Sequence, residues 1–241
     1  MSINSIKQAL LDSVNVDHQP VGKILVGANL TLVQGKRWGM ASTLTEANVH
    51  NNFIKETGRL HNALISFLLE KFLSERIFES SLGMAALNSV LDIPTSFNLA
   101  DAYNEIEQRS FAKNVAVVGH FPFVDKLDKI SENCWVFERK LQDGDLPAER
   151  MPDFLPKADV LVLTAQVIAN NCFQNIIELA PHAFKIMLGP STPLSPVLFD
   201  YGIDVLGGVR VTDPDLVYQY IAQGAHFKQL RGIEKITLKR F

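Results

Sequence analysis

Cysteine is scarce in this sequence of 241 residues, and it has neither a long apolar run nor a long run of one charge. Cys134 and Cys172 stand among apolar neighbours, which predicts buried free thiols and no disulfide. No segment approaches the roughly 20 apolar residues that span a bilayer, so we expect no membrane contact. The net charge of −3 provides no basic face for a phosphate backbone, so we expect no nucleic-acid partner.

Several catalytic and metal-binding motifs are missing as well. The patterns C-x-x-C, H-x-x-x-H and H-E-x-x-H do not occur, and the six histidines are scattered, which argues against a structural zinc site. The sequence contains no G-x-S-x-G elbow, so it gives no indication of a serine nucleophile. No G-x-G-x-x-G follows the first strand pattern of the second half, which argues against a dinucleotide bound in the usual pose.

The N-terminal segment predicts an amphipathic helix. Its apolar stripe consists of Ile3, Ile6, Ala9, Leu10 and Val14, which are spaced as on one helix face. The segment lacks the positive-then-apolar plan of a signal peptide, so we expect the protein in the cytoplasm.

The rest of the first half predicts a small mixed α+β domain. Alternating apolar residues and a glycine turn indicate an antiparallel meander over 21–43. Residues 58–91 follow a helical pattern. The polar stretch 99–113 marks a boundary, so we assign residues 1–100 to this first domain.

The second domain, residues 101–241, alternates strand patterns with helical ones. The predicted strands cover 114–120, 133–138, 158–164, 183–188 and 203–211, and the predicted helices cover 121–130, 165–180 and 213–224. Continuous apolar runs such as NVAVV are typical of strands covered on both faces, and strand–helix alternation is typical of parallel βαβ units. We therefore predict an α/β fold, in which a Rossmann-like open parallel sheet follows the smaller α+β domain.

Ligands of an open parallel sheet bind beyond the carboxyl ends of its strands. The predicted strand ends carry Gly119 and His120, Glu138, Thr164, and the run Gly189, Pro190, Ser191 and Thr192. In that run, two hydroxyls before a helix starting at Pro193 would give a turn that attracts an anion, or Ser191 and Thr192 simply cap the helix. We expect these turns to converge, because their strands run side by side in one direction.

Each candidate side chain also has a structural interpretation. His120 donates to a ligand, binds a metal or moves a proton, or it is a partly buried histidine bonded to backbone. Glu138 accepts a hydrogen bond from a polar ligand, or it pairs with a neighbouring cation such as Arg139. Asn170 and Asn171 face a cleft or are exposed, since asparagine is a poor helix-interior residue.

The second half resembles the family described as "putative heavy-metal chelation" in four segments: VVGHFPFV, VFERKLQDGDLP, ADVLVLTAQVIANNCFQNII and IMLGPSTPLSPVLFDYGIDVLGG. The first half resembles the domain that accompanies them, in GANLTLVQGKRWGMAST and SSLGMAALNSVL. The resemblance implies an enolase N-terminal-like first domain, a Rossmann-like second domain and a ligand cleft between them.

The resemblance also implies which residues form the site. The family's motifs fall on Gly119 and His120, Glu138, Asn170, and Gly189, Pro190, Ser191 and Thr192. From the first domain, Asn88 would lie nearest the cleft. One departure follows the third strand, where the family tends to have Thr-Gly and this chain has Thr164, Ala165 and Gln166. Losing a glycine narrows the approach of a ligand to the backbone, so the ligand can differ from that of closer members.

The sequence favours two hypotheses about function, which belong to different classes. The first is a small-ligand-binding protein that chelates a heavy metal or an anionic metal complex in the cleft, with His120 and Glu138 as ligands of a transition-metal ion. The alternative is an enzyme that acts on a small anionic metabolite through acid/base chemistry of the same two residues. A regulatory or scaffolding domain with a degenerate pocket ranks last. Residues 234–241 alternate like an edge strand that pairs within the fold or with a second copy, which leaves a homo-oligomer open.

Overall fold

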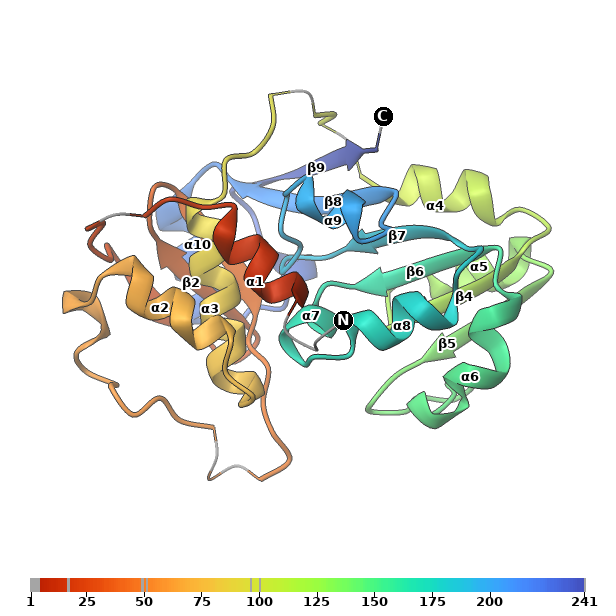
Figure 1. The fold of residues 1–241 in the computed structure, drawn as a ribbon, viewed down its shortest axis with the longest axis horizontal. Helices are drawn as coiled ribbons and strands as arrows, with labels where there is room; N and C mark the ends of the chain where they lie inside the picture. Colours follow the sequence, from red (N-terminus) through yellow and green to blue (C-terminus); the bar gives the residue numbers. More distant parts are fainter. Residues whose placement is uncertain are drawn as a thin grey trace.

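The computed structural model describes residues 5–16, 18–48, 50, 52–95, 97–99 and 101–240. A three-stranded sheet and a six-stranded sheet lie side by side in it (Figure 1). The predicted N-terminal helix is confirmed as α1 (Ser5–Asp12), with Ile6 and Leu10 of its stripe buried. Ile3, at the start of that stripe, lies outside the described residues.

The antiparallel meander predicted over 21–43 is confirmed. It consists of β1 (Ile24–Val26), β2 (Leu30–Gln34) and β3 (Trp38–Ser42), paired in chain order. The central strand is buried on both faces, because Leu30 and Leu32 belong to one apolar cluster and Val33 belongs to another.

The helical pattern of 58–91 is confirmed in three pieces. They are η2 (Leu60–Asn62), α2 (Ile65–Phe72) and α3 (Ile77–Val90). α3 lies directly on the meander, and small residues permit this approach. A Cβ added at Gly39 would come within 2.2 Å of the carbonyl oxygen of Ala85. The GMAA run in α3 therefore reflects close packing on two sides, since Ala85 lies against Gly39 of β3 and Gly83 lies against Phe72 of α2.

The six-stranded sheet is open and mostly parallel. It contains β4 (Asn114–Val118), β5 (Asn133–Phe137), β6 (Val160–Thr164), β7 (Phe184–Leu188), β8 (Val205–Val211) and β9 (Ile233–Lys239). The strands lie in the order β5-β4-β6-β7-β8-β9, and only the β8–β9 pair is antiparallel. This is the doubly wound order 2-1-3-4-5 with one strand added, and its winding reverses between β4 and β6. The predicted α/β fold class is confirmed.

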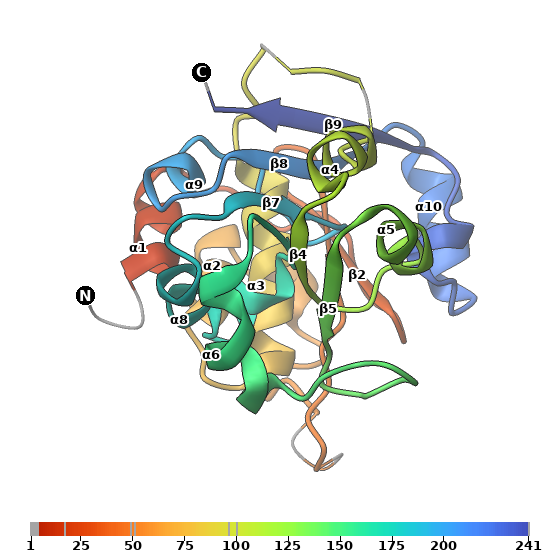
Figure 2. The same ribbon diagram turned by 90° about the vertical axis from the view of Figure 1, so that its right-hand side faces the viewer.

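Helices cover both faces of this sheet. They are α4 (Tyr103–Ser110), α5 (Val124–Ile130), α6 (Met151–Phe154), α7 (Gln166–Ala169), α8 (Phe173–Leu179) and α9 (Val197–Asp200), with short 3-10 turns η3 (Ala148–Arg150) and η4 (Leu155–Lys157). Between β8 and β9 the chain forms α10 (Pro214–Ala222) and the 3-10 turn η5 (Phe227–Gln229). Figure 2 shows α4 and α5 on one face and α6 and α8 on the other. Along β4, Val115 and Val117 join one cluster, and Ala116 and Val118 join the other. Burial of both faces explains the continuous apolar runs.

The prediction of one continuous helix over 165–180 is wrong. α7 ends at Ala169, Asn171 adopts a left-handed φ of 63°, and α8 begins at Phe173. Asparagine tolerates this conformation better than most residues, and its short polar side chain favours turns over helix interiors. Asn170 therefore lies at a bend between two short helices.

Two further helix predictions need correction. No helix begins at Pro193 among the described residues, because the helix after β7 starts at Val197. Three prolines between 190 and 196 remove backbone donors that a helix needs. Ser191 and Thr192 therefore neither cap a helix nor form an anion-binding helix start. The polar stretch 99–113, predicted only as a boundary, contains α4.

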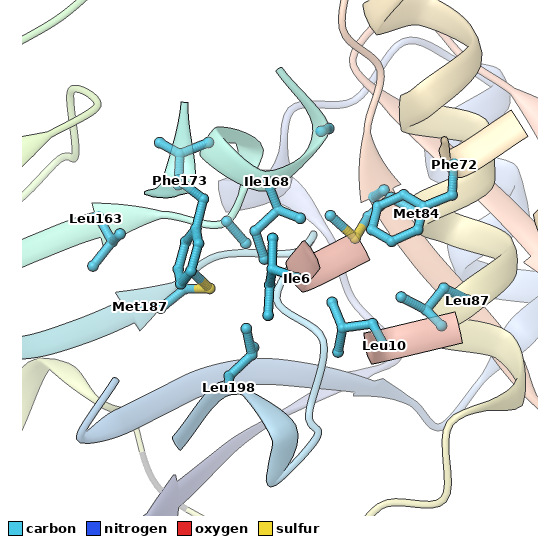
Figure 3. Packing of buried hydrophobic residues seen from close by; sticks show 14 of the residues in the cluster. Ile6, Leu10, Phe72, Met84, Leu87, Leu163, Ile168, Phe173, Met187 and Leu198 are labelled. Atoms are coloured by element: carbon cyan, nitrogen blue, oxygen red, sulfur yellow. The ribbon is translucent and has the colours of Figure 1, made fainter. Parts of the chain in front are cut away.

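One buried apolar cluster joins the two sheets (Figure 3). α1 places Ile6 and Leu10 between Leu87 of α3 and Met187 of β7. On the other side of the meander, α10 packs against β1 and β2. Because packing is continuous across residue 100, the division of the chain into two domains stays a prediction, as does the enolase-like description of the first part.

Both edges of the six-stranded sheet are partly covered. β9 pairs with β8 inside the fold, which resolves the pairing of the C-terminal strand, and Asn98 exchanges backbone hydrogen bonds with Thr237. At the opposite edge, the N–H of Leu146 donates to the carbonyl of Val136. Such cover leaves less free edge for another strand. In the part of the chain that the structure describes, no helix is long and apolar enough to cross a membrane.

Both cysteines are free, as predicted, but they differ in burial. Cys134 is partly buried, and this burial, with a contribution from Asp128, raises the pKa of its thiol to about 11. Cys172 is exposed, so the prediction that it is buried is wrong. The reason is the bend at Asn171, which puts Cys172 at the start of α8 instead of mid-helix.

Lys7 on α1 is a cation buried between the two parts of the molecule. Its side chain is 1% exposed, and Nζ donates to Ser80 Oγ at 3.0 Å and to the carbonyl oxygen of Ala169 at 3.2 Å. The ammonium also lies over the Phe72 ring. Burial lowers the pKa of Lys7 from 10.5 to about 8.

Raising the pH should stabilise the protein through Lys7. Between about pH 8 and 10.5 the unfolded chain keeps a proton that the folded chain has released, so the free energy of unfolding increases with pH. The shift corresponds to about 3 kcal/mol. Lys7→Met removes the titrating group and should lack this increase in denaturant titrations across the window. Cys134 acts in the opposite sense above about pH 9, so wild type and variant are compared at each pH. A constant difference between them would contradict the prediction.

Candidate functional site

The turns after several parallel strands meet at one edge of the six-stranded sheet. In Figure 1 the arrowheads of β6 and β7 point toward the part of the molecule that carries α2 and α3. These turns open on a cavity of about 830 Å³, which we name the strand-end groove. Its lining includes six of the ten predicted site residues: Gly119, His120, Glu138, Thr164, Gly189 and Pro190.

Two glycines allow the backbone to form these turns. Gly119 has a φ of 103° and Gly189 a φ of 122°, a region that side chains disfavour. A Cβ at Gly119 would also lie 3.1 Å from Cγ2 of Thr164, whereas one at Gly189 would meet nothing within 4 Å. Gly189 is therefore required for its conformation alone, and it leaves the backbone open to the groove.

His120 pairs with a buried carboxylate. Its Nδ1 lies 3.0 Å from Oδ1 and 3.2 Å from Oδ2 of Asp145, whose side chain is 2% exposed. The backbone N–H of Gln142 donates to Asp145 Oδ2 at 2.9 Å and holds the carboxylate in place. An ionised carboxylate only accepts, so Nδ1 carries the proton and Nε2 is the ring nitrogen left for a ligand.

Glu138 supports the same turn through backbone hydrogen bonds. Its Oε2 accepts the N–H of His120 at 2.9 Å, and its Oε1 accepts the N–H of Arg139 at 2.6 Å. Both oxygens are thus engaged, and the carboxylate ties the end of β5 to the turn after β4. Glu138 fixes the backbone from which the His120 ring projects.

The lining of the groove carries both cations and aromatic rings. Its charged residues are Lys126, Lys228, Arg231 and Lys235, against Asp101 and Glu138. Lys235 pairs with Asp101, which leaves three cations against Glu138, a net excess of two positive charges. Phe121 and Phe123 stack with centroids 5.1 Å apart and planes within 6°. An excess of cations favours an anionic ligand, and ring faces favour a flat one.

Four predicted site residues lie outside the strand-end groove. At the bend between α7 and α8, Asn170 Oδ1 accepts a backbone hydrogen bond at 3.2 Å. Ser191 and Thr192 are each 4% exposed. Asn88 Nδ2 donates to the carbonyl oxygens of Met40 at 2.9 Å and Ser191 at 3.1 Å. A role for these four residues in ligand binding stays a prediction.

A preformed cage for a bare metal ion is not found in the described ranges. There, no group of three or more His, Cys, Asp and Glu side chains is placed to hold a metal. Of the two predicted metal ligands, His120 offers a ring nitrogen, while both oxygens of Glu138 accept backbone hydrogen bonds. A metal centre built from these two residues stays a prediction. The residues present fit a metal ion that is already coordinated by a chelator better than they fit a bare ion.

Sequence reasoning missed Asp145 and the far wall of the groove. Asp145 comes 25 residues after His120, and no spacing rule pairs residues that meet through a loop. The only local sequence feature near Asp145 is the Asp-Gly pair at 143–144, which predicts a turn but does not predict that Asp145 contacts His120. The far wall, with Phe227 and Arg231, follows α10 and reaches the groove because β9 returns antiparallel to β8.

Ser191 should matter for stability, because its hydroxyl joins the two sheets. Its Oγ accepts the backbone N–H of Ser42 at 2.8 Å. Ser191→Ala leaves that donor without its partner and should lower the free energy of unfolding by about 1–3 kcal/mol. Thr192→Val is the matched control, since the hydroxyl it removes is buried and has no hydrogen-bond partner within the described chain. Urea denaturation should show little loss for the control, and equal losses would contradict this assignment.

Two solved structures have the same fold over nearly their whole length. A protein of unknown function from Desulfitobacterium hafniense DCB-2 is 24% identical, with a TM-score of 0.83, and the match covers 99% of this chain and 98% of that one. A protein of unknown function from Pyrococcus horikoshii is 22% identical, with a TM-score of 0.78, and the match covers 100% of both chains. At these identities the likeness concerns the fold. No curated protein matches the chain.

Family models agree with the resemblance noted in the sequence. Residues 7–91 match the DUF4213 model and residues 101–239 match the DUF364 model, and both carry the description "Putative heavy-metal chelation". Both solved structures are described as DUF364 proteins. The second match spans more than half of the sequence, so the chain belongs to the DUF364 family, described as "Putative heavy-metal chelation".

Proposed function

We propose that the strand-end groove binds an anionic chelate of a transition-metal ion, and that His120 contributes one nitrogen ligand to the metal. The observation that carries this proposal is the His120–Asp145 pair. A buried carboxylate 3.0 Å from Nδ1 orients the ring and leaves Nε2 available. Histidines that bind metals typically donate their other ring N–H to such a carboxylate, which raises the basicity of the ligating nitrogen.

A chelate suits the groove better than a bare ion does. A bare transition-metal ion usually takes three or more protein ligands, and the described residues provide no such group. An organic anion that already surrounds the metal leaves one or two coordination positions, and a single histidine fills one of them. Binding of a metal chelate agrees with the family description, and it requires no metal centre made of protein ligands alone.

The charge and shape of the groove favour an anionic organic ligand. Lys126, Lys228 and Arg231 supply positive charge around the lining. The stacked rings of Phe121 and Phe123 present flat apolar surface. Cationic side chains attract the carboxylates of a chelator, and aromatic faces accommodate a planar portion, so the organic part contributes to recognition.

Nickel(II)–nitrilotriacetate is a direct probe, because its chelator is anionic and leaves coordination positions open to imidazole. We expect isothermal titration calorimetry to show saturable binding of this chelate. Nitrilotriacetate alone and free nickel(II) should bind at least about tenfold more weakly. The first lacks the metal that His120 would bind, and the second lacks the anionic chelator that the cations of the groove would attract. His120→Ala should abolish the preference for the chelate, and Asp145→Asn should weaken binding by about 10–100-fold.

His182→Ala is the matched control for adventitious coordination by imidazole. His182 is exposed and does not line the groove, so this variant should bind the chelate as wild type does. Thermal melting of each variant checks folding. Equal affinity of wild type for free nickel(II) and for the chelate would contradict the proposal, and so would unchanged binding by His120→Ala.

The His120–Asp145 pair also favours a second candidate, an enzyme acting on a small anionic metabolite. A histidine oriented by a buried carboxylate has the geometry of a general base. In this candidate His120 is the base, and Glu138 holds the turn through the backbone hydrogen bonds that both of its oxygens accept. Incubation with a mixture of small carboxylates and phosphates, followed by mass spectrometry, separates the two candidates. Product that forms with wild type and not with His120→Ala would support the enzyme.

A further inference from the structure

The strand-end groove extends well beyond the surroundings of His120. Its lining begins with Glu138, after β5, and continues across the ends of β4, β6, β7 and β8 to Ile236 on β9. Neighbouring strands of a sheet lie about 4.8 Å apart, so β9 runs roughly 19 Å from β4, the strand that leads to His120. The volume of about 830 Å³ suits a ligand of drug size. A compact chelate bound to His120 therefore covers only one end of the groove.

A protruding ribbon of two strands forms the far wall of the groove. β8 pairs with β7 only from Val205 to Gly207, whereas it pairs with β9 from Val205 to Val211. Residues 208–211 and 233–236 therefore extend together beyond the end of β7. Because β6 and β7 lie between β4 and β8, this ribbon borders the groove on the side opposite the turn that carries His120.

The excess positive charge of the groove lies at this far wall. On the side of β4 and β5, Lys126 and Glu138 balance each other. The charged residues of the far wall are Lys228, Arg231, Lys235 and Asp101, which pairs with Lys235. Three cations and one carboxylate leave a net charge of two at the far wall, which is the whole excess of the groove. A wall with this charge favours an anionic group.

Two of these cations, Lys228 and Arg231, are available to a ligand. Both are exposed, and neither forms an ion pair in the part of the chain that the structure describes. The segment that carries them has a fixed backbone. The N–H of His226 donates to Gln229 Oε1 at 2.8 Å, and the carbonyl of Gly232 accepts two backbone N–H groups at 2.8 and 3.0 Å. The two cations therefore project from a preorganised turn.

Between the two ends, the described residues that line the groove are uncharged. The ends of β7 and β8 contribute Leu188, Gly189, Gly207 and Gly208 to this floor. A Cβ added at Gly189 would meet nothing within 4 Å, so the space above this residue is open. An ionised group of a ligand would find no partner of opposite charge on this floor, whereas an uncharged section loses little by lying on it.

We infer that the ligand of the groove is an elongated chelate. Its metal end binds at His120, an uncharged section crosses the floor, and a second carboxylate at its other end binds Lys228 and Arg231. The planar fork of a guanidinium group matches a carboxylate, and hydrogen bonds between ionised groups are the stronger ones. The inference rests on the proposed function, because it assigns the metal end to His120, and it adds the class of chelator.

Two nickel(II) complexes that differ in one terminal group test the inference. Both contain nitrilotriacetate with an aminobutyl arm, whose nitrogen is acylated with glutaric acid in one complex and with pentanoic acid in the other. The arms have equal length, and only the glutaryl arm ends in a carboxylate. Calorimetric titration of the full chain should show at least about tenfold tighter binding of the glutaryl complex.

The preference for the glutaryl complex should depend on the far wall. Lys228→Gln and Arg231→Gln should each reduce it, and the double variant should bind the two complexes equally. Lys129→Gln is the matched control, because Lys129 is an exposed cation of α5 that does not line the groove. This variant should keep the full preference. His120→Ala should weaken both complexes, since they share the metal end.

Equal affinity of wild type for the two complexes would overturn the inference and leave the proposed function intact. A preference that persists in the double variant would also overturn it, and so would a loss in Lys129→Gln as large as that in Arg231→Gln. Absence of binding by both complexes would contradict the inference and the proposed function together. The comparison of the two complexes uses wild type alone, so it does not depend on the folding of any variant.

Discussion

Parallel pairing of β4, β6 and β7 is the constraint on which the candidate site depends. Because these strands run in one direction with aligned ends, the turns that follow them open at a single edge of the sheet. Gly119 and Gly189 then let the backbone leave the strands at left-handed φ angles. The topology of the sheet therefore determines where the groove lies, and the side chains that line the groove determine its chemistry.

In the proposed function, that chemistry is divided between residues that shape the turn and His120, which would contact the ligand. Glu138 holds the backbone around His120, and Asp145 holds the ring. Two carboxylates thus position one histidine, Glu138 through the backbone N–H and Asp145 through the ring. We propose that this arrangement reconciles the family description with described residues that form no metal cage, because the protein would fix one nitrogen donor and the ligand would bring the others.

The sequence predicts the strands better than the contacts between loops. Apolar runs buried on both faces identify β4 and β6 directly, and the rule for parallel sheets then points to His120. The sequence does not predict the bend at Asn171, because helical periodicity continues through it. It does not predict α4 either, because the polar residues of this helix resemble a linker. The pairing of His120 with Asp145 depends on how a loop folds back, which no local pattern encodes.

Nitrogen NMR of the histidine side chains can test whether Asp145 orients His120 toward a metal chelate. Neutral His120 should carry its proton on Nδ1, and adding diamagnetic zinc(II)–nitrilotriacetate should shift the Nε2 resonance of His120 selectively. A proton on Nε2 in the neutral ring would contradict the proposed role of Asp145. A zinc chelate that shifts other histidines and leaves His120 unchanged would contradict the proposed ligand site.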